Sequence, residues 1–474
     1  MGTINSALSI TTGALDADQA ALNVVANNVA NANTTGYTVE TPNWQENAPI
    51  DTAGIQIGQG VTETGATSQR NLVLQARLDQ QQQQAASSST RLTALNNIQA
   101  LFTPDSNASS SAMAGDIGSD ITSFFDSFSS LESDPTNNAL RERVLSSAST
   151  LAGDISNAAN SLNQQSASLS QEASGIASQV NSLTGAIAEL NVQIQSTSPN
   201  ADAGTLEDQR QQDISLLSTL IGINQVKTED NGLAITTTSG QVLVDEGNSF
   251  QLTTGNVSGA TDFFLDGTDI TSDLASGGGQ LGGYLTARTV DIPNALGALD
   301  QLAYSVSTSV NAQNNSGTDA DGATGTAANP LYIFNQPTQV AGSAASMSVV
   351  MTDPNQIAAA GAGDGTGDNS NAVAMASLAG QTMVSGQTPI NYYSNFVSTL
   401  GATVTEVQTE NTAQNASVTQ LQTQNDALSS VNLNDEAAAM STLETSYQAA
   451  SQVFTMLNTV MSSALNLGDQ TAVS

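Results

Sequence analysis

The side chains available for chemistry in this chain are almost entirely carboxylates, amides and hydroxyls. The sequence of 474 residues contains no cysteine and no histidine. This excludes disulfides, thiolate and Ser-His-Asp catalysis, and zinc or haem sites built on those side chains. The basic residues are seven arginines and Lys227. An enzyme of this composition has only carboxylates, hydroxyls and a few cations to work with.

Three groups of acidic or glycine residues come closest to a recognisable site. Asp262, Asp266 and Asp269 could supply the carboxylate pair of a glycosidase, but such pairs arise by chance among 43 acidic residues. The stretches DADG (319–322) and GAGDGTGDN (361–369) suggest calcium loops, yet both lack the glutamate and further ligands at fixed spacing. The glycines of the second stretch do not follow a strand and open a helix, as in a nucleotide loop. We therefore predict acidic turns, with no catalytic residues, no metal and no cofactor.

The charge balance limits the kinds of partner that the protein can bind. The 43 acidic and 8 basic residues give a formal net charge of -35. A surface of this sign repels phosphate backbones and anionic lipid, so we expect no nucleic-acid partner. No apolar run is long enough to span a bilayer, so we expect no membrane insertion. Only 4% of the residues are aromatic, which favours long thin helices packed through Ala, Leu, Ile and Val.

The N-terminal region carries apolar residues at the spacing of a paired helix. One apolar residue recurs every seven positions, and others fall on the second position of the same seam. Gly36 then supplies a helix stop. The seam consists of Ile4, Leu8, Leu15, Leu22, Val25 and Val29, and it is interrupted by Thr11 and Asp18.

The C-terminal region has the clearest repeat of the chain. Large apolar residues lie seven apart over roughly four heptads. We interpret this stripe as the core of a helix pair rather than as a cofactor site. The seam consists of Leu433, Met440, Leu443, Tyr447, Ala450, Phe454, Leu457, Met461 and Ala464.

The two heptad helices predict a coiled coil between the ends of the chain. A helix of this kind gains most of its stability from packing rather than from propensity. Neither end is therefore expected to be stable alone, and the pair is expected to complete its fold by packing against neighbouring molecules.

The segment between the ends begins and continues as helix. Residues 68–220 have helical periodicity, with breaks expected at Pro104, Pro135 and Pro199, because a proline disfavours helix in the residue before it. Residues 138–195 carry leucines and isoleucines seven apart and predict one continuous helix. The polar tract 80–90 contains no Gly or Pro, which favours a solvated helix.

The period changes near residue 223. Apolar residues alternate there, and Asn231-Gly232 and Ser239-Gly240 mark hairpin turns. The sequence thus predicts a mainly α protein with a β insertion: terminal heptad helices paired as a coiled coil, a rod domain of long helices and a small outward β domain. The expected segments are 1–36, the N-terminal coiled-coil helix, which pairs with 431–467; 37–67, an extended linker; 68–222, helical rod; 223–285, β region; 286–313, a helix returning to the rod; 314–366, outward loops and strands; 367–430, helical rod; and 431–474, the C-terminal coiled-coil helix.

Both ends also resemble a known family. The stretch ANNVANANTTGY (26–37) is similar to the signature of bacterial flagellar rod, hook and hook-associated proteins. The VNL start at 431–433, which leads into YQA at 447–449, is similar to their C-terminal helix. Four internal stretches narrow the resemblance to the hook-associated proteins of the hook–filament junction. They are AELNVQI (188–194), LEDQRQQDISLLSTLIGI (206–223), GGQLGGYLTARTVDIPNALGALDQLAYSVSTSVNAQ (278–313) and GDNSNAVAMASLAGQ (367–381).

This resemblance implies a structural role and no enzyme activity. Subunits would form a ring that joins the hook to the filament side, so that the filament can assemble, and the paired terminal helices would line a central channel. The protein would be secreted through the flagellar type III export apparatus and would lie outside the cell. The implied partners are other copies of the chain, the hook protein, the second hook–filament junction protein, the export apparatus and an export chaperone that binds the C-terminal helix.

The asparagines near the end of the first helix allow two interpretations. Their chemistry alone favours a solvated helix face followed by a fraying end, because Asn tolerates left-handed geometry. The family resemblance instead favours hydrogen bonds from Asn28 and Asn31 to neighbouring subunits. We therefore include both residues in the expected assembly interface.

Three other functions compete with this interpretation. A hook or rod protein shares the termini, but its middle is expected to be mostly β, unlike residues 68–220. A secreted enzyme carried on flagellar termini would need a deep pocket, for which residues 223–366 are too rich in Gly and too poor in aromatics. A surface adhesin that binds through the β region stays open as an alternative or added role.

Overall fold

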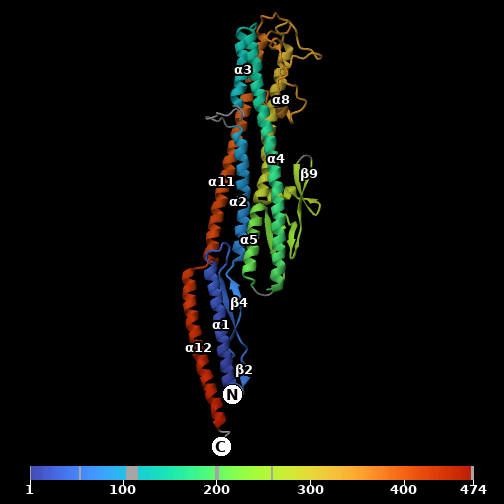
Figure 1. Ribbon diagram of the computed structural model, residues 1–474. Coiled ribbons are helices and arrows are strands. Elements are labelled where there is room, and N and C mark those ends of the chain that lie inside the picture. Colours follow the sequence, from blue (N-terminus) through green and yellow to red (C-terminus); the bar gives the residue numbers. More distant parts are fainter. Residues whose placement is uncertain (1, 53–54, 103–115, 198–201, 258–259, 471–474) are drawn as a thin grey trace.

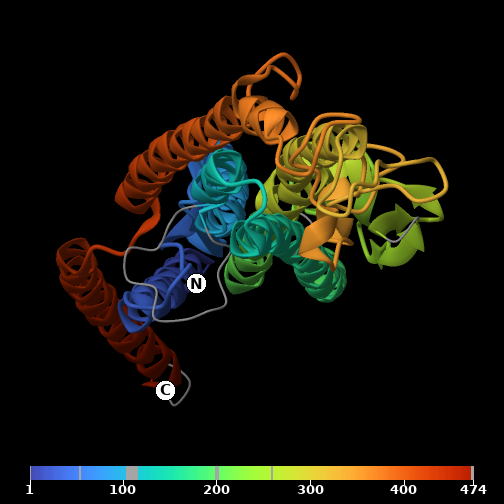
Figure 2. The same ribbon diagram turned by 90° about the horizontal axis from the view of Figure 1, so that it is seen from above.

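The computed structural model of the chain describes residues 2–52, 55–102, 116–197, 202–257 and 260–470. These residues form an elongated molecule whose helices run close to its long axis, and the two ends of the chain lie at the same end of the molecule (Figure 1). Seen along the axis, strands and loops lie to one side of the helices (Figure 2). The predicted fold class, mainly α with a β insertion, is confirmed.

The helices account for most of the chain. The longer ones are α1 Gly2–Asn31, α2 Leu72–Ala100, α3 Ile117–Ser133, α4 Asn138–Thr197, α5 Thr205–Leu220, α8 Ile292–Ser316, α11 Pro389–Ser429 and α12 Leu433–Gln470. The shorter ones are α6 Thr271–Gly277, α7 Gly279–Thr286, the π-turn η1 Ala287–Asp291, α9 Ser343–Ser346, η2 Pro354–Gln356, α10 Ser370–Ser377 and η3 Leu378–Gly380.

Capping side chains set several helix starts. The Asn71 side chain accepts a hydrogen bond from the Leu74 amide at 3.0 Å at the start of α2. Thr388 accepts one from the Asn391 amide at 3.3 Å before α11, where Pro389 occupies the first turn. Such caps satisfy amides that have no partner within the helix.

In the described part of the chain, the strands form four small antiparallel sheets. One is β1 Glu40–Glu46 with β4 Val61–Ser68, and a second is the hairpin of β2 Ile50–Thr52 with β3 Ile55–Ile57. The third has the order β5 Ile223–Lys227, β6 Leu233–Thr237, β7 Val242–Asp245, β8 Asn248–Ser249. The fourth has the order β11 Thr268–Asp269, β10 Ala260–Leu265, β9 Leu252–Val257.

Two expected local features are confirmed. The helix α4 is continuous over 60 residues and includes all of 138–195. The turn between β5 and β6 contains Asn231 with a φ of 59°, and the turn between β6 and β7 contains Gly240 with a φ of 93°. Asn and Gly are the residues that adopt such left-handed conformations most readily.

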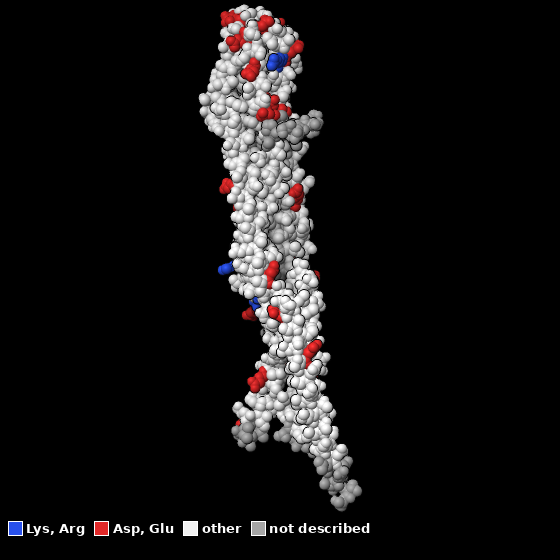
Figure 3. Space-filling model, turned by 90° about the vertical axis from the view of Figure 1, so that its left-hand side faces the viewer, with Lys and Arg blue, Asp and Glu red and all other residues white. Residues whose placement is uncertain are grey.

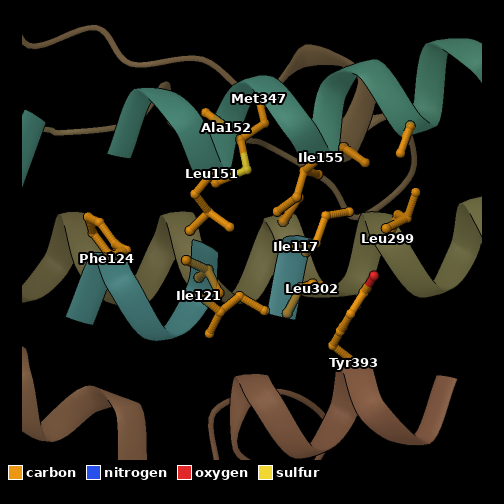
Figure 4. Close-up of a cluster of buried hydrophobic side chains, with 14 of the residues drawn as sticks. Ile117, Ile121, Phe124, Leu151, Ala152, Ile155, Leu299, Leu302, Met347 and Tyr393 are labelled. Carbon is orange, nitrogen blue, oxygen red and sulfur yellow. The ribbon is translucent and has the colours of Figure 1, made fainter. Parts of the chain in front are cut away.

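The rod has two apolar cores stacked along α4. The upper core joins α3, α4, α8 and α11, and its buried side chains interdigitate between those helices (Figure 4). Phe124 is its aromatic centre, with ring centroids 5.1 Å from Phe125 and 5.4 Å from Phe128 in edge-on arrangement. The lower core packs α4, α5 and α7 against the sheets of the β region.

The predicted β region, residues 223–285, extends too far toward the C-terminus. The strands end at Asp269, and residues 271–286 form α6 and α7. The glycines of α7, which argue against a helix in the sequence, allow its backbone to approach α2 closely. A Cβ at Gly283 would lie only 2.5 Å from the Ser87 carbonyl oxygen.

The polar tract 80–90 is helical as expected but is not solvated throughout. Gln83, Ala85 and Ser88 are buried. The Gln83 Nε2 donates to the Ile223 carbonyl at 3.0 Å. Small and amide side chains here let α2 pack tightly against α7 and β5, which the composition of the tract alone does not reveal.

The loops that follow α8 are held by buried asparagines rather than by a sheet. The Asn311 Nδ2 donates to the Phe334 carbonyl at 2.9 Å, and its Oδ1 accepts from the amides of Ile333 and Phe334 at 3.0 Å. Asn314 holds Leu331 and Ala358 in the same way. Within the described ranges, no helix has the length and apolar character needed to cross a membrane.

Candidate assembly interface

The two ends of the chain meet in what we call the terminal unit, composed of α1, α12 and the strands β1 to β4. In it, α1 packs against α12 and also against β1 and β4. In Figure 1, α12 lies on one side of α1 and the strands on the other. The terminal unit extends beyond the lower end of the rod, which we define as the part from α2 to α11.

The most buried side chains of α1 are small. Ala17, Ala21 and Val25 are almost fully buried. The larger residues Ile4, Leu8, Leu15 and Leu22 of the predicted seam are half-buried, and Val29 is 40% exposed. The small residues let α1 fit closely between α12 and the strands, while the leucines keep part of their apolar surface uncovered.

The helix α12 turns part of its predicted seam toward α1 and leaves a second apolar stripe open. The half-buried seam residues are Met440, Leu443, Ala450, Phe454, Leu457 and Met461, whereas Leu433, Tyr447 and Ala464 are exposed. The second stripe lies about 100° away around the helix, one position before the seam residues, and its side chains are exposed. It consists of Val453, Met456 and Val460 and is called the outer stripe below.

Most of α12 is uncharged within an otherwise acidic terminal unit. Residues 445–468, most of α12, contain no Asp, Glu, Lys or Arg. On the face shown in Figure 3, acidic side chains are most frequent at the upper end of the rod and sparse over the terminal unit. An uncharged, partly apolar helix surface is the kind that packs against another protein surface.

Asn28 is buried in the terminal unit and does not lie on a solvated helix face. It is 1% exposed, and its three hydrogen bonds stay within the chain. Its Nδ2 donates to the Glu40 carbonyl at 2.8 Å, and its Oδ1 accepts from the Glu40 amide at 3.0 Å and from the Tyr37 hydroxyl at 2.8 Å. Asn28 thus joins the start of β1 to the end of α1, and we call this set of contacts the asparagine clamp.

The neighbouring asparagines are less buried. The Asn31 side chain is half-buried and donates to the carbonyl of Asn27 at 3.1 Å and to its Oδ1 at 2.9 Å. Thr34 donates to the Asn31 Oδ1 at 3.1 Å. Asn27 and Asn33 are exposed.

A second clamp, which the sequence analysis missed, joins the terminal unit to the rod. The Arg70 guanidinium bonds Glu207 at 2.6 Å and Asp208 at 2.5 Å, both on α5. The other oxygen of Asp208 accepts from the Thr38 amide at 3.0 Å. The scarcity of basic residues could have indicated this clamp, because each arginine of so acidic a chain can bind several carboxylates.

The last helix of the rod is tied to the same joint. The Val39 amide donates to the Ser429 carbonyl at 2.8 Å, and the Gln69 amide to the Val39 carbonyl at 2.9 Å. A cavity of about 500 Å³ lies beside these contacts, between the loop after α1, α5 and the end of α11. The terminal unit therefore joins the rod through polar contacts around an incompletely filled space.

Carboxylates crowd this joint. Burial raises the pKa of Glu40, and Asp202 and Asp208 raise it further, while Arg70 opposes them. Burial also raises the pKa of the Tyr37 hydroxyl, with added contributions from Glu40, Asp208 and Glu436. One cation thus holds together several groups that would otherwise repel one another.

The acidic stretches weighed as calcium loops are closed turns. The Asp319 Oδ1 accepts from the amides of Asp321 and Ala323 at 3.0 and 2.8 Å. The Asp368 Oδ2 accepts from the amides of Gly361 and Ser370 at 2.8 and 3.0 Å. In the part of the chain that the structure describes, no cluster of three or more acidic side chains could hold a metal ion.

The glycosidase candidates take part in an ion pair, a helix cap and a turn of the β region. Asp262 is bonded by Arg288 at 3.4 Å, and Asp269 caps the Thr271 amide at 2.9 Å. Asp266 lies in the turn between β10 and β11 with a φ of 48°. These carboxylates have structural roles in the β region.

Comparison with known proteins gives these features a context. The model of the flagellar hook-associated protein FlgK helical domain matches residues 95–328, and that of the flagella basal body rod protein matches residues 8–38. Flagellar hook-associated protein 1 of Bacillus subtilis is 26% identical over 502 residues, with 96% of each chain covered. The chain is thus similar to flagellar hook-associated protein 1 over nearly its whole length.

Other hook-associated proteins match over shorter ranges. Hook-associated protein 1 of Salmonella typhimurium is 29% identical over 331 residues, which cover 67% of this chain and 57% of that protein. The match to this relative thus spans less than two thirds of the relative's length. The solved structure of the flagellar hook junction protein FlgK from Burkholderia pseudomallei superposes with a TM-score of 0.65 at 18% identity, covering 75% of this chain and all of that one. At that identity the likeness concerns the fold.

Proposed function

We propose that this protein is a structural component of the bacterial flagellum that forms the ring joining the hook to the filament side, so that the filament can assemble. The observation that carries the proposal is the terminal unit. Its helices come from both ends of the chain, and they leave the outer stripe of α12 exposed and the α1 leucines only half-buried. The similarity to flagellar hook-associated protein 1 supports the same role.

The uncovered apolar surface fits a subunit that finishes its packing in an assembly. Burying an exposed Val or Met side chain contributes about 1.5–3 kcal/mol. The helix α12 contacts α1 along one side, and residues 445–468 contain no charges that would oppose burial of the other side. The predicted interface residues on both helices, from Ile4 to Val29 and from Leu433 to Met461, belong to this proposal.

The finer parts of the proposed role come from the resemblance to hook-associated proteins. The partners are other copies of the chain, the hook protein and the second hook–filament junction protein, with export through the flagellar apparatus aided by a chaperone on α12. The site of action is extracellular, between hook and filament. The protein acts by assembly and catalyses no reaction.

Deletion of the gene tests this role. The proposal predicts cells with hooks that lack filaments and that release flagellin into the medium. The same strain complemented with the intact gene recovers its filaments. Filaments that stay attached in the deletion strain would contradict the proposal.

A further inference from the structure

Two exposed apolar surfaces of the terminal unit have no covering segment in the part of the chain that the structure describes. One is the outer stripe of α12, in which Met456 is 66% exposed. The other, called the hairpin patch, consists of Trp44 on β1 with Ile50 and Ile57 on β2 and β3, which are 48%, 54% and 37% exposed. Ile50 and Ile57 are direct cross-strand partners, so their side chains share one face of the hairpin.

These two surfaces lie on different sides of the same helix. Both α12 and the β1–β4 sheet pack against α1, and among the described residues α12 has no extensive contact with any of these strands. In Figure 1, the β2 hairpin lies at the level of the lower half of α12, with α1 between them. A single terminal unit cannot bring the outer stripe and the hairpin patch together.

We propose that the hairpin patch of one subunit packs on the outer stripe of α12 of the next subunit. This inference rests on the proposed ring assembly and names the surfaces that form it. An interface between two different surfaces of the same chain continues from subunit to subunit and can close into a ring. An interface that pairs a surface with itself would stop at a dimer.

Charge favours this pairing over the self-pairing of either surface. Glu46 lies on β1 with Trp44, and Glu63 on β4 is the cross-strand partner of Trp44, so two hairpins facing each other would bring like charges together. Residues 445–468 of α12 are uncharged and oppose the acidic hairpin with no repulsion. Pairing α12 with α12 would also avoid repulsion, but it would leave Trp44 and the two isoleucines uncovered.

The second copy is also the occupant that fits the chemistry of the stripe. A basic partner protein would be attracted to the acidic rod, and the outer stripe has no carboxylate to offer it. The stripe offers only apolar and small polar side chains. The hairpin patch has the matching apolar character and is present once for every stripe.

Cysteine cross-linking tests the contact, because the native chain contains no cysteine. Flagella are isolated from cells that produce the variant I50C/M456C, oxidised, and examined by denaturing electrophoresis without reductant. The expected result is a series of oligomers larger than a dimer. Mixed assembly of the single variants I50C and M456C gives dimers, and each variant alone gives none.

A matched pair controls for random collision. In V192C/M456C, the first cysteine lies on α4 of the rod at a position 52% exposed, and no cross-linking is expected. Absence of cross-links in I50C/M456C, in flagella that still carry filaments, would overturn the interface and leave the proposed function standing. Dimers from M456C alone would show that α12 pairs with itself and would also overturn it.

A charge test separates packing from accidental proximity. The variant M456E places a carboxylate opposite the acidic hairpin and is expected to reduce the fraction of filamented hooks more strongly than M456K, whose ammonium is attracted there. Equal loss in both variants would contradict the pairing. Met456 is exposed, so the isolated subunit is expected to fold normally in both variants.

Discussion

The rod and the terminal unit are built from the same kind of long, aromatic-poor helix, but they bury their apolar side chains to different extents. In the rod, helices and sheets pack against α4 along its length, and α4 residues such as Leu151 and Ile155 are fully buried. In the terminal unit, α12 packs against one helix, and its outer stripe stays exposed. The difference indicates that the rod is complete within one chain, whereas the terminal unit is completed by its neighbours.

The largest expected effect of a substitution is in the upper core of the rod. Phe124→Ala removes a fully buried ring from between Phe125, Phe128 and Phe334. We expect the unfolding free energy to fall by about 3–5 kcal/mol, measured by urea denaturation of the isolated chain. The matched substitution V453A, on the outer stripe, is expected to change it by less than about 0.5 kcal/mol. Similar losses in both variants would erase the contrast between the two regions.

The second largest loss of stability is expected at Arg70, which joins the terminal unit to the rod. Arg70→Met leaves Glu207 and Asp208 largely buried without their cation, and we expect a loss of about 3 kcal/mol. The triple variant R70M/E207Q/D208N removes the stranded charges and is expected to recover part of that loss. A single variant as stable as the native chain would show that the joint does not depend on Arg70.

The asparagine clamp should have a smaller effect. Asn28→Ala leaves the backbone groups of Glu40 without their partners, and we expect a loss of about 1–3 kcal/mol together with faster amide exchange at the start of β1. Asn27→Ala, at an exposed position one residue earlier, serves as the control. If the variants N28Q and N31Q left the isolated chain unchanged but blocked ring incorporation, Asn28 would act between subunits instead.

The smallest of these effects concerns pH and is confined to the rod. Burial, a hydrogen bond with Asp154 and the charges of Asp154 and Asp116 raise the pKa of Asp120 from 3.8 to about 7. The folded chain thus keeps a proton that the unfolded chain releases, so the unfolding free energy is expected to fall as the pH rises from 3.8 to about 7. In Asp120→Asn this fall should be weaker, which denaturation at pH 5 and pH 8 can measure. An unchanged pH profile would exclude this carboxylate pair as its source.

The helices and turns that depend on local residue patterns could be predicted from the sequence. The leucines and isoleucines seven apart predicted α4, and Asn231-Gly232 predicted the first hairpin of the β region. The sequence also predicted helices at both ends, and these pack side by side. Which residues of the two seams contact a neighbouring subunit is still a prediction.

The features that the sequence did not predict depend on contacts between distant segments. Arg70 meets Asp208 across 138 positions, and no spacing rule indicates such a pair. The glycines of α7 look like helix breakers until α2 is packed against them. Asn28 was grouped with its exposed neighbours because its burial depends on where β1 returns to α1.

The central claim, that the terminal unit gains lasting order by assembly, is tested most directly by hydrogen exchange followed by mass spectrometry. The isolated full chain and the same chain in purified hook–filament structures are compared over α12 and α4. The account predicts rapid exchange of α12 and slow exchange of α4 in the isolated chain, with α12 becoming protected in the assembly. Equal, strong protection of α12 and α4 in the isolated chain would contradict it.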